Sequence, residues 1–202
     1  MHARLRVRDL LIASWETGSD TLRRVLPAGL DPTAIGGRYL ASLAAFRVEG
    51  GRLGRAPVLP YSQLNVRAYT TWKEEPAVFF VAARVTAGGL AGVLVGAPFR
   101  YARLRVRRGL VRARGLGVSL RYEVGETADP GLLGRHELGL FESDGLRLIR
   151  LGRAATEWRR AEVVEPARAD FLVALGLEPG PEPELLYAER ASFETEVPPA
   201  AA

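Results

Sequence analysis

Cysteine is absent from this chain of 202 residues, and histidine, lysine, methionine, asparagine and glutamine are almost absent. Without cysteine there can be no disulfide, thiolate nucleophile or thiolate metal site. His2 and His136 are the only histidines, and His2 lies at the terminus. A histidine-based metal centre or a serine–histidine triad is therefore not expected. We expect no metal ion and no cofactor.

Long apolar runs are also absent, so the sequence predicts neither a signal peptide nor a membrane span. We accordingly expect a cytoplasmic protein that does not bind membranes. The length fits one domain, which we place at residues 1–197, followed by a disordered Pro/Ala tail at 198–202. The sequence leaves the oligomeric state open, and a homo-oligomer is compatible with it.

Positive charge comes almost entirely from arginine, with 27 arginines and one lysine. Scarce Asn, Gln, Cys and Met are typical of a thermophile, although GC-rich coding also favours arginine. Residues 76–122 hold nine arginines and no acid, whereas residues 123–202 hold eight basic and sixteen acidic groups. Two interpretations stay open: the acidic segment pairs with the arginines, or the arginines form a nucleic-acid surface.

Alternating apolar positions between Gly/Pro turns predict a strand-rich domain with few helices. Such runs of strands, without βαβ alternation, favour a mostly antiparallel α+β fold. Three hairpins are expected, with turns at 73–76, at Arg108-Gly109 and at 143–145. The expected helices are 19–26, with Ser19 as its N-cap, 90–95 and 167–175. The expected strands are 37–48, 61–72, 77–87, 101–107, 110–116, 118–124, 138–141, 146–151, 156–164 and 185–197.

The strand at 61–72 carries an unusual row of polar side chains. Gln63 and Asn65 are the only side-chain amides in the protein, and Arg67 and Tyr69 follow at the same spacing. Alternate residues of a strand share one face, so these four share a face opposite Leu64 and its apolar neighbours. The row is typical of a polar pocket lining. Its arginine either clamps a small carboxylate or pairs with a buried acid of the protein.

Three segments carry a resemblance to a known family. They are Leu64-Asn65-Val66-Arg67-Ala68-Tyr69, Pro76-Ala77-Val78-Phe79-Phe80 and Ala97-Pro98-Phe99-Arg100-Tyr101-Ala102-Arg103-Leu104. In this order they resemble the YqjF-like family of uncharacterised proteins, which is grouped with the acetoacetate decarboxylase-like superfamily. The resemblance implies a strongly curved antiparallel sheet around a central pocket.

The resemblance also implies where chemistry would lie. Decarboxylases of this superfamily form a Schiff base on a pocket lysine, in a motif that falls on 96–100 here. Phe99 and Arg100 stand in place of its lysines, and a guanidinium is no amine nucleophile. The single lysine, Lys73, lies in a turn beside two glutamates. We therefore expect no Schiff-base decarboxylase. Gln63 stands where the family usually has glutamate. This exchange removes a possible acid/base group, so the remaining role of the row is to recognise a ligand.

The expected ligand is a small anionic or carbonyl-bearing molecule, and the catalytic residues, if the protein is an enzyme, stay unknown. Any enzyme activity would be lyase-like or hydrolase-like on a small carboxylate. The alternative function is nucleic-acid binding by the Arg-rich hairpin at 100–114. The candidate ligand-binding residues are Gln63, Asn65, Arg67, Tyr69, Arg84, Arg100 and Tyr101.

Overall fold

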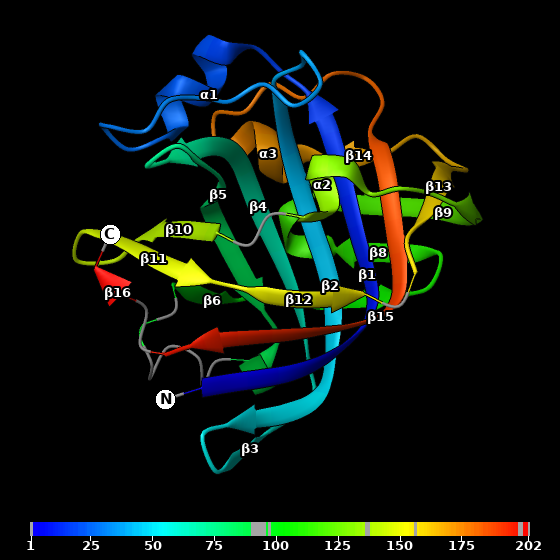
Figure 1. The fold of residues 1–202 in the computed structure, drawn as a ribbon. Coiled ribbons are helices and arrows are strands. Elements are labelled where there is room, and N and C mark those ends of the chain that lie inside the picture. Colours follow the sequence, from blue (N-terminus) through cyan, green and yellow to red (C-terminus); the bar gives the residue numbers. More distant parts are fainter. Residues whose placement is uncertain are drawn as a thin grey trace.

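The structure, a computed structural model, describes residues 2–89, 96, 98–135, 138–155, 157–197 and 200–201. Within these residues sixteen strands join in one sheet (Figure 1). The strands are β1 (His2–Glu16), β2 (Leu40–Leu53), β3 (Ala56–Val58), β4 (Tyr61–Trp72), β5 (Glu75–Val85), β6 (Phe99–Tyr101), β7 (Leu104–Arg107), β8 (Leu110–Ala113), β9 (Val118–Thr127), β10 (Leu138–Glu142), β11 (Leu146–Arg150), β12 (Gly152–Ala155), β13 (Arg159–Val163), β14 (Arg168–Ala169), β15 (Glu184–Glu196) and β16 (Ala200–Ala201). The helices are α1 (Ser19–Val25), α2 (Gly131–Arg135) and α3 (Asp170–Ala174).

The sheet follows the order β16-β11-β10-β5-β4-β2-β1-β15-β13-β9-β8-β7, and the short strands β3, β6, β12 and β14 pair beside this path. Its pairs are antiparallel except that β10 and β6 both run parallel to β5. The sheet curls until β7 lies against β2 and β4. This strand-dominated, unclosed curved sheet confirms the expected α+β, mostly antiparallel fold class.

All three predicted hairpins are present as β4–β5, β7–β8 and β10–β11. The β4–β5 turn consists of Lys73 and Glu74, both with positive φ (48° and 70°), between the paired residues Trp72 and Glu75. Two central residues with positive φ match the twist of the strands that they join. The turn therefore fixes the register of β4, and with it the face on which the polar row lies.

Several boundaries differ from the expectation. Glycines 50 and 51 were expected to end a strand, but β2 runs through both to Leu53 and pairs with β1 and β3. The register with β1 shifts at Arg6/Val7, where Glu49 is left without a partner, so β2 contains a bulge directly before Gly50, which has φ 151°. Gly18, not Ser19, is the N-cap of α1.

The predicted strand at 101–107 divides into two elements. Tyr101 ends β6, which pairs with β5, and only Leu104–Arg107 continue as the hairpin strand β7. The helix expected at 167–175 is confined to α3, because Arg168 and Ala169 pair with β9 as β14. The helix expected at 90–95 lies outside the described residues. Of the tail, 198–199 and 202 also lie outside them, and Ala200–Ala201 form β16 beside β11.

Two apolar cores lie on opposite faces of the long strands. The first core contains Leu64, Val66 and Ala68 of β4, and α1 and α3 cover it near one end of the long strands (Figure 1). The second core contains Tyr61 and Tyr69 of the same strand and receives Leu133, a helix residue of α2, together with half-buried Trp158. Other large buried members of the first core include Leu11, Trp15, Leu22, Leu43, Val106, Leu120, Tyr122, Phe171 and Tyr187. Those of the second include Leu10, Ile12, Leu40, Phe46, Val78, Val85 and Leu186.

Gly51 supplies a test of the close approach of β1 to β2 beside this bulge. A Cβ atom built at Gly51 would lie 2.0 Å from the carbonyl oxygen of Arg4 and 2.9 Å from the Cα of Leu5. Because both neighbours are backbone, Gly51→Ala should lower the free energy of unfolding by about 1–3 kcal/mol. The control is Gly115→Ala, where nothing lies within 4 Å of the added atom and the change should stay within about 0.5 kcal/mol. Urea unfolding measures both, and equal effects would contradict the close approach of the two backbones.

Candidate functional site

The polar row of β4 is buried on the face of the second core. Gln63 is 7% exposed, Asn65 6%, Arg67 3% and Tyr69 0%. Gln63 Nε2 donates to Asn65 Oδ1 at 2.9 Å, so the two amides form a pair along the strand. This hydrogen bond fixes the orientation of both amides. Their remaining N–H donors and the Gln63 carbonyl oxygen therefore point in defined directions. The sequence-based prediction of a shared inward face agrees with this geometry.

Arg67 is held by two hydroxyls. Its Nε donates to Ser42 Oγ at 3.0 Å and its Nη2 to Tyr69 OH at 3.3 Å, and its guanidinium carbon lies 5.8 Å from the Tyr69 ring centre. In the described part of the chain Arg67 forms no ion pair with a carboxylate. A buried cation without a counter-ion is unfavourable, so this position has a strong tendency to attract an anion.

Two serines extend the polar patch across the sheet, at right angles to β4. Ser42 on β2 is the cross-strand partner of Arg67, and Ser14 on β1 is the partner of Ser42. Both serines are buried, and Ser14 Oγ has no hydrogen-bond partner among the described residues. Sequence reasoning missed both. The available signal was weak: each is a single hydroxyl within an otherwise apolar run.

Arg84 and Arg100 lie on the other face. Arg84 is the partner of Leu64, a residue of the first core, and Arg100 pairs with Arg84 across β5 and β6. Burial, and then the positive charge of Arg100, lower the pKa of Arg84. Its guanidinium lies 4.9 Å from the ring centre of Phe171. The structure therefore does not bring these two cations to the polar row.

Phe99 lies on the face of the polar row, since it pairs with Ala83 and Ala83 pairs with Asn65. Its half-buried ring packs against the second core. Tyr101 has the same orientation through its partner Val85, but it is 56% exposed. Of the seven candidate residues, the four of β4 thus lie together and Tyr101 lies at the periphery.

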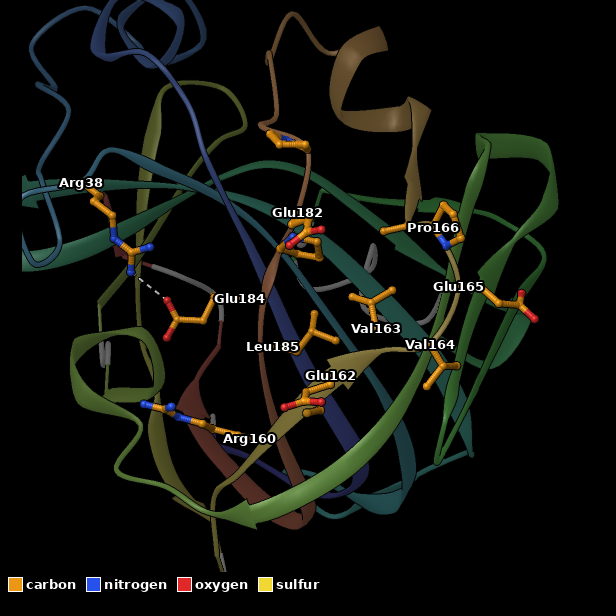
Figure 2. Close-up of a pocket in the computed structure, with 14 residues that line it drawn as sticks. Arg38, Arg160, Glu162, Val163, Val164, Glu165, Pro166, Glu182, Glu184 and Leu185 are labelled. Atoms are coloured by element: carbon orange, nitrogen blue, oxygen red, sulfur yellow. Dashed lines mark hydrogen bonds and ion pairs between the residues drawn. The ribbon is translucent and has the colours of Figure 1, made fainter.

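Two cavities described in the structure lie away from this row. The larger, of about 900 Å³, lies between β13 and the start of β15, and its lining contains Arg38, which donates to Glu184 at 2.8 Å (Figure 2). Val163 and Leu185 form its apolar part, and several carboxylates surround it. The second, of about 530 Å³, is lined by Arg108, Glu157, Arg159, Tyr187, Glu189 and Arg190. None of the seven candidate residues lines either cavity.

The arginines of the β7–β8 hairpin face solvent. They and their neighbours, all exposed and without an ion pair in the residues that the structure describes, are Arg100, Arg103, Arg105, Arg107, Arg108, Arg112 and Arg114. The ion pairs of the last segment are mostly made elsewhere, as by Glu189 with Arg8 and by Glu194 with Arg4. The Arg121–Glu165 pair is the ion pair described between the two segments. Of the two interpretations, pairing of the acidic segment with the hairpin arginines is therefore not observed in the described residues.

The comparison with protein families places this geometry in context. A family model of uncharacterized conserved proteins, DUF2071, matches residues 4–189. The chain belongs to the DUF2071 family. A comparison with curated proteins finds no match to this DUF2071 member.

Solved structures agree with the fold. An acetoacetate decarboxylase-like enzyme from Sphingomonas wittichii RW1 superimposes with a TM-score of 0.65 at 16% identity, over 100% of this chain and 93% of that one. The enduracididine biosynthesis enzyme MppR complexed with pyruvate gives 0.65 at 16% identity, over 96% and 88%. Acetoacetate decarboxylase from Legionella pneumophila subsp. pneumophila str. Philadelphia 1 gives 0.65 at 13%, over 98% and 87%. The likeness confirms the acetoacetate decarboxylase-like fold implied by the sequence.

In the described residues, no group of three or more His, Asp or Glu side chains is placed to hold a metal ion. No helix in the same part of this DUF2071 member is long and apolar enough to cross a membrane.

Tyr61 lies at the start of β4, on the same face as the polar row, and makes the stability of the fold depend on pH. Burial raises the pKa of its phenol to about 12. Because the unfolded value is about 10, the fold favours the neutral phenol, and this stabilisation is complete below pH 10 and lost as the pH rises toward 12. From about pH 9 to about pH 11 the wild type should lose about 1 kcal/mol more unfolding free energy than Tyr61→Phe. Chemical denaturation at both pH values measures this; equal losses would show that Tyr61 is not buried from water.

Proposed function

We propose that the protein binds a small carboxylate or carbonyl compound on the polar row of β4, with Arg67 as the anion-binding group. The observation that carries the proposal is the buried residue Arg67, 3% exposed, whose guanidinium is oriented by two hydroxyls and has no carboxylate partner in the described residues. A carboxylate ligand would supply the missing negative charge through two parallel hydrogen bonds. The Gln63–Asn65 amide pair and the Ser14 hydroxyl offer neutral groups for a carbonyl or hydroxyl of the same ligand.

Known proteins of the fold support this class of ligand. MppR was solved in complex with pyruvate, a 2-oxo acid, and the relatives described above include decarboxylases of the 3-oxo acid acetoacetate. Both compounds combine a carboxylate with a ketone, which is the chemistry that a guanidinium beside amides and hydroxyls recognises. The likeness supports the ligand class, while the assignment of residues rests on the burial and contacts of the row.

We further propose that binding proceeds without a Schiff base. Phe99 occupies the position that the superfamily resemblance assigns to a lysine, and its ring faces the polar row across Ala83. The one lysine, Lys73, lies in the β4–β5 turn, where its Nζ is 5.1 Å from the Trp72 ring centre. Neither residue offers an amine at the row.

Arg67→Met should weaken binding of pyruvate and acetoacetate by about 10–100-fold, because a hydrogen bond to a charged group contributes about 1.5–3 kcal/mol. Arg84→Met on the opposite face is the matched control and should leave affinity within about twofold. Titration calorimetry gives the affinities. Borohydride reduction with pyruvate, read by mass spectrometry, should leave Lys73 unmodified.

Thermal melts separate binding from a structural role. If Arg67 serves only as the partner of a buried acid, Arg67→Met should destabilise the protein by about 3–5 kcal/mol, and the wild type should not respond to carboxylates. That combination of results would show that Arg67 belongs to a structural ion pair, and it would contradict the proposal.

A second candidate function, binding of single-stranded nucleic acid, is favoured by the unpaired arginines of the β7–β8 hairpin. Arg105 and Arg112 lie directly opposite each other across the two strands. Opposed like charges destabilise a strand pair, and phosphates would relieve the repulsion. Tyr101 is the one exposed large aromatic found beside them among the described residues, whereas single-strand binders usually stack bases on several. The hairpin would therefore bind backbone phosphates with little preference for sequence.

Replacing Arg105, Arg107 and Arg112 together by serine should remove about three phosphate contacts. The slope of log K against log salt for a short oligothymidylate should then fall by about 2. Fluorescence anisotropy over a salt series measures the slope.

The control for net charge is a triple change of three arginines that already form ion pairs, Arg4, Arg23 and Arg150 to serine. It removes the same charge and should leave the slope nearly unchanged. Equal effects of the two triple variants would show that the binding reflects net charge alone.

A further inference from the structure

The central strand β1 contains a distortion that aims a carboxylate into the first core. Asp9 has φ 54°, in the left-handed region, and the register of β1 with β2 shifts between Arg8 and Leu11. The residue is only 6% exposed. Non-glycine residues seldom adopt this conformation, and such positions gather at functional sites. A bulge that directs a side chain inward is a recurrent way to build one.

Asp9 meets a pair of buried tyrosines. The Tyr187 hydroxyl donates to Asp9 Oδ1 at 2.9 Å, and the Tyr122 ring lies 5.9 Å from that of Tyr187. Arg47 contributes the nearest cation, with Nη2 at 4.0 Å from Asp9 Oδ2. Burial, strengthened by the neighbouring carboxylate, raises the pKa of both phenols, so they stay neutral. Because its proton is committed to Asp9, Tyr187 presents its oxygen lone pairs as acceptors.

The smaller cavity, of about 530 Å³, lies against Tyr187. Two of its arginines have unused donors. Arg159 is the cross-strand partner of Tyr187, so it lies on the same inward face, and its Nε is buried without a hydrogen-bond partner. Arg108 lies in the β7–β8 turn, and neither arginine forms an ion pair in the described part of the chain.

The carboxylates of the same cavity are already engaged. Glu189 accepts from Arg8 at 3.4 Å, and Glu157 accepts from the Thr127 hydroxyl. The cavity therefore combines two cations that lack counter-ions with a tyrosine hydroxyl of fixed orientation. Its volume is that of small-molecule sites, about 300–1,000 Å³.

We infer that this cavity is a second ligand site, separate from the polar row, which takes a small oxyanion, a carboxylate or a phosphate, held by Arg108 and Arg159 over Tyr187. Two guanidiniums give parallel hydrogen bonds to an oxyanion. The Tyr187 oxygen accepts from a hydroxyl of the same ligand. Asp9 orients the tyrosine and is a positioning residue.

Titration calorimetry with inorganic phosphate and with malate, which adds a hydroxyl to two carboxylates, tests the inference. The wild type should bind at least one of them with a stoichiometry of one at this site. Arg108→Ser and Arg159→Gln should each weaken binding about tenfold or more, the loss expected for one charged hydrogen bond. Arg108 is an exposed turn residue, so its replacement keeps the test valid even where Arg159→Gln fails to fold.

Two controls keep the site distinct from the other proposals. Arg55→Ser replaces an exposed arginine between β2 and β3 that does not line the cavity, and it should change affinity less than about twofold. Arg67→Met should leave phosphate binding intact, because the polar row lies on the other face of the sheet. Loss of binding in Arg55→Ser equal to that in Arg108→Ser, loss in Arg67→Met, or no binding by the wild type would each overturn the inference. Tighter binding of malate than of succinate, lost in Tyr187→Phe, would support the role of the tyrosine.

Discussion

The two-residue period of β4 is the constraint on which the rest of the molecule depends. Leu64, Val66 and Ala68 pack into the first core, while Gln63, Asn65 and Arg67 alternate with them on the opposite face. A slip of one residue would move a guanidinium and two amides into an apolar core and expose three apolar side chains to the polar face. The β4–β5 turn, with its two positive φ values, holds the strand against such a slip. Register, core packing and the proposed binding site are therefore set by one hairpin.

Local features of the fold were predictable from the sequence because they depend on nearby residues. The bounds of β4, the three hairpins and the shared face of the polar row follow from alternation and turn chemistry alone. The face of Arg84 relative to that row was not predictable in this way. The pairing of β4 with β5 shifts register between Val66 and Arg67, and only the pairing decides which side chains share a face. Ser14 and Ser42 were missed because nothing in their own strands distinguishes them. Only the strand pairing places Ser42 beside Arg67 and Ser14 beside Ser42.

The partners of the charged residues were likewise not predictable from the sequence. The acidic surplus of the last segment and the arginine surplus of the middle one are plain in the sequence, and their mutual neutralisation was a reasonable hypothesis. The strand order decides otherwise. Because β15 pairs with β1, its glutamates lie beside arginines of the N-terminal strand, as in the Arg4–Glu194 pair. The β7–β8 hairpin, at the end of the sheet, is left with its positive charge. Both the nucleic-acid candidate and the availability of Arg108 for an anion derive from that order.

The position of β1 also governs how the chain can fold. This strand lies in the middle of the sheet, yet most of the described chain separates it from its partner β15. Until residues 184–196 emerge, one edge of β1 has no partner, and the apolar run around Leu11 lies along an open sheet edge. Pairing between such distant segments is slow, and an unpaired apolar edge is a template for association. The nascent chain therefore cannot complete this sheet until residues 184–196 have been synthesised, and until then the apolar edge of β1 has to be shielded.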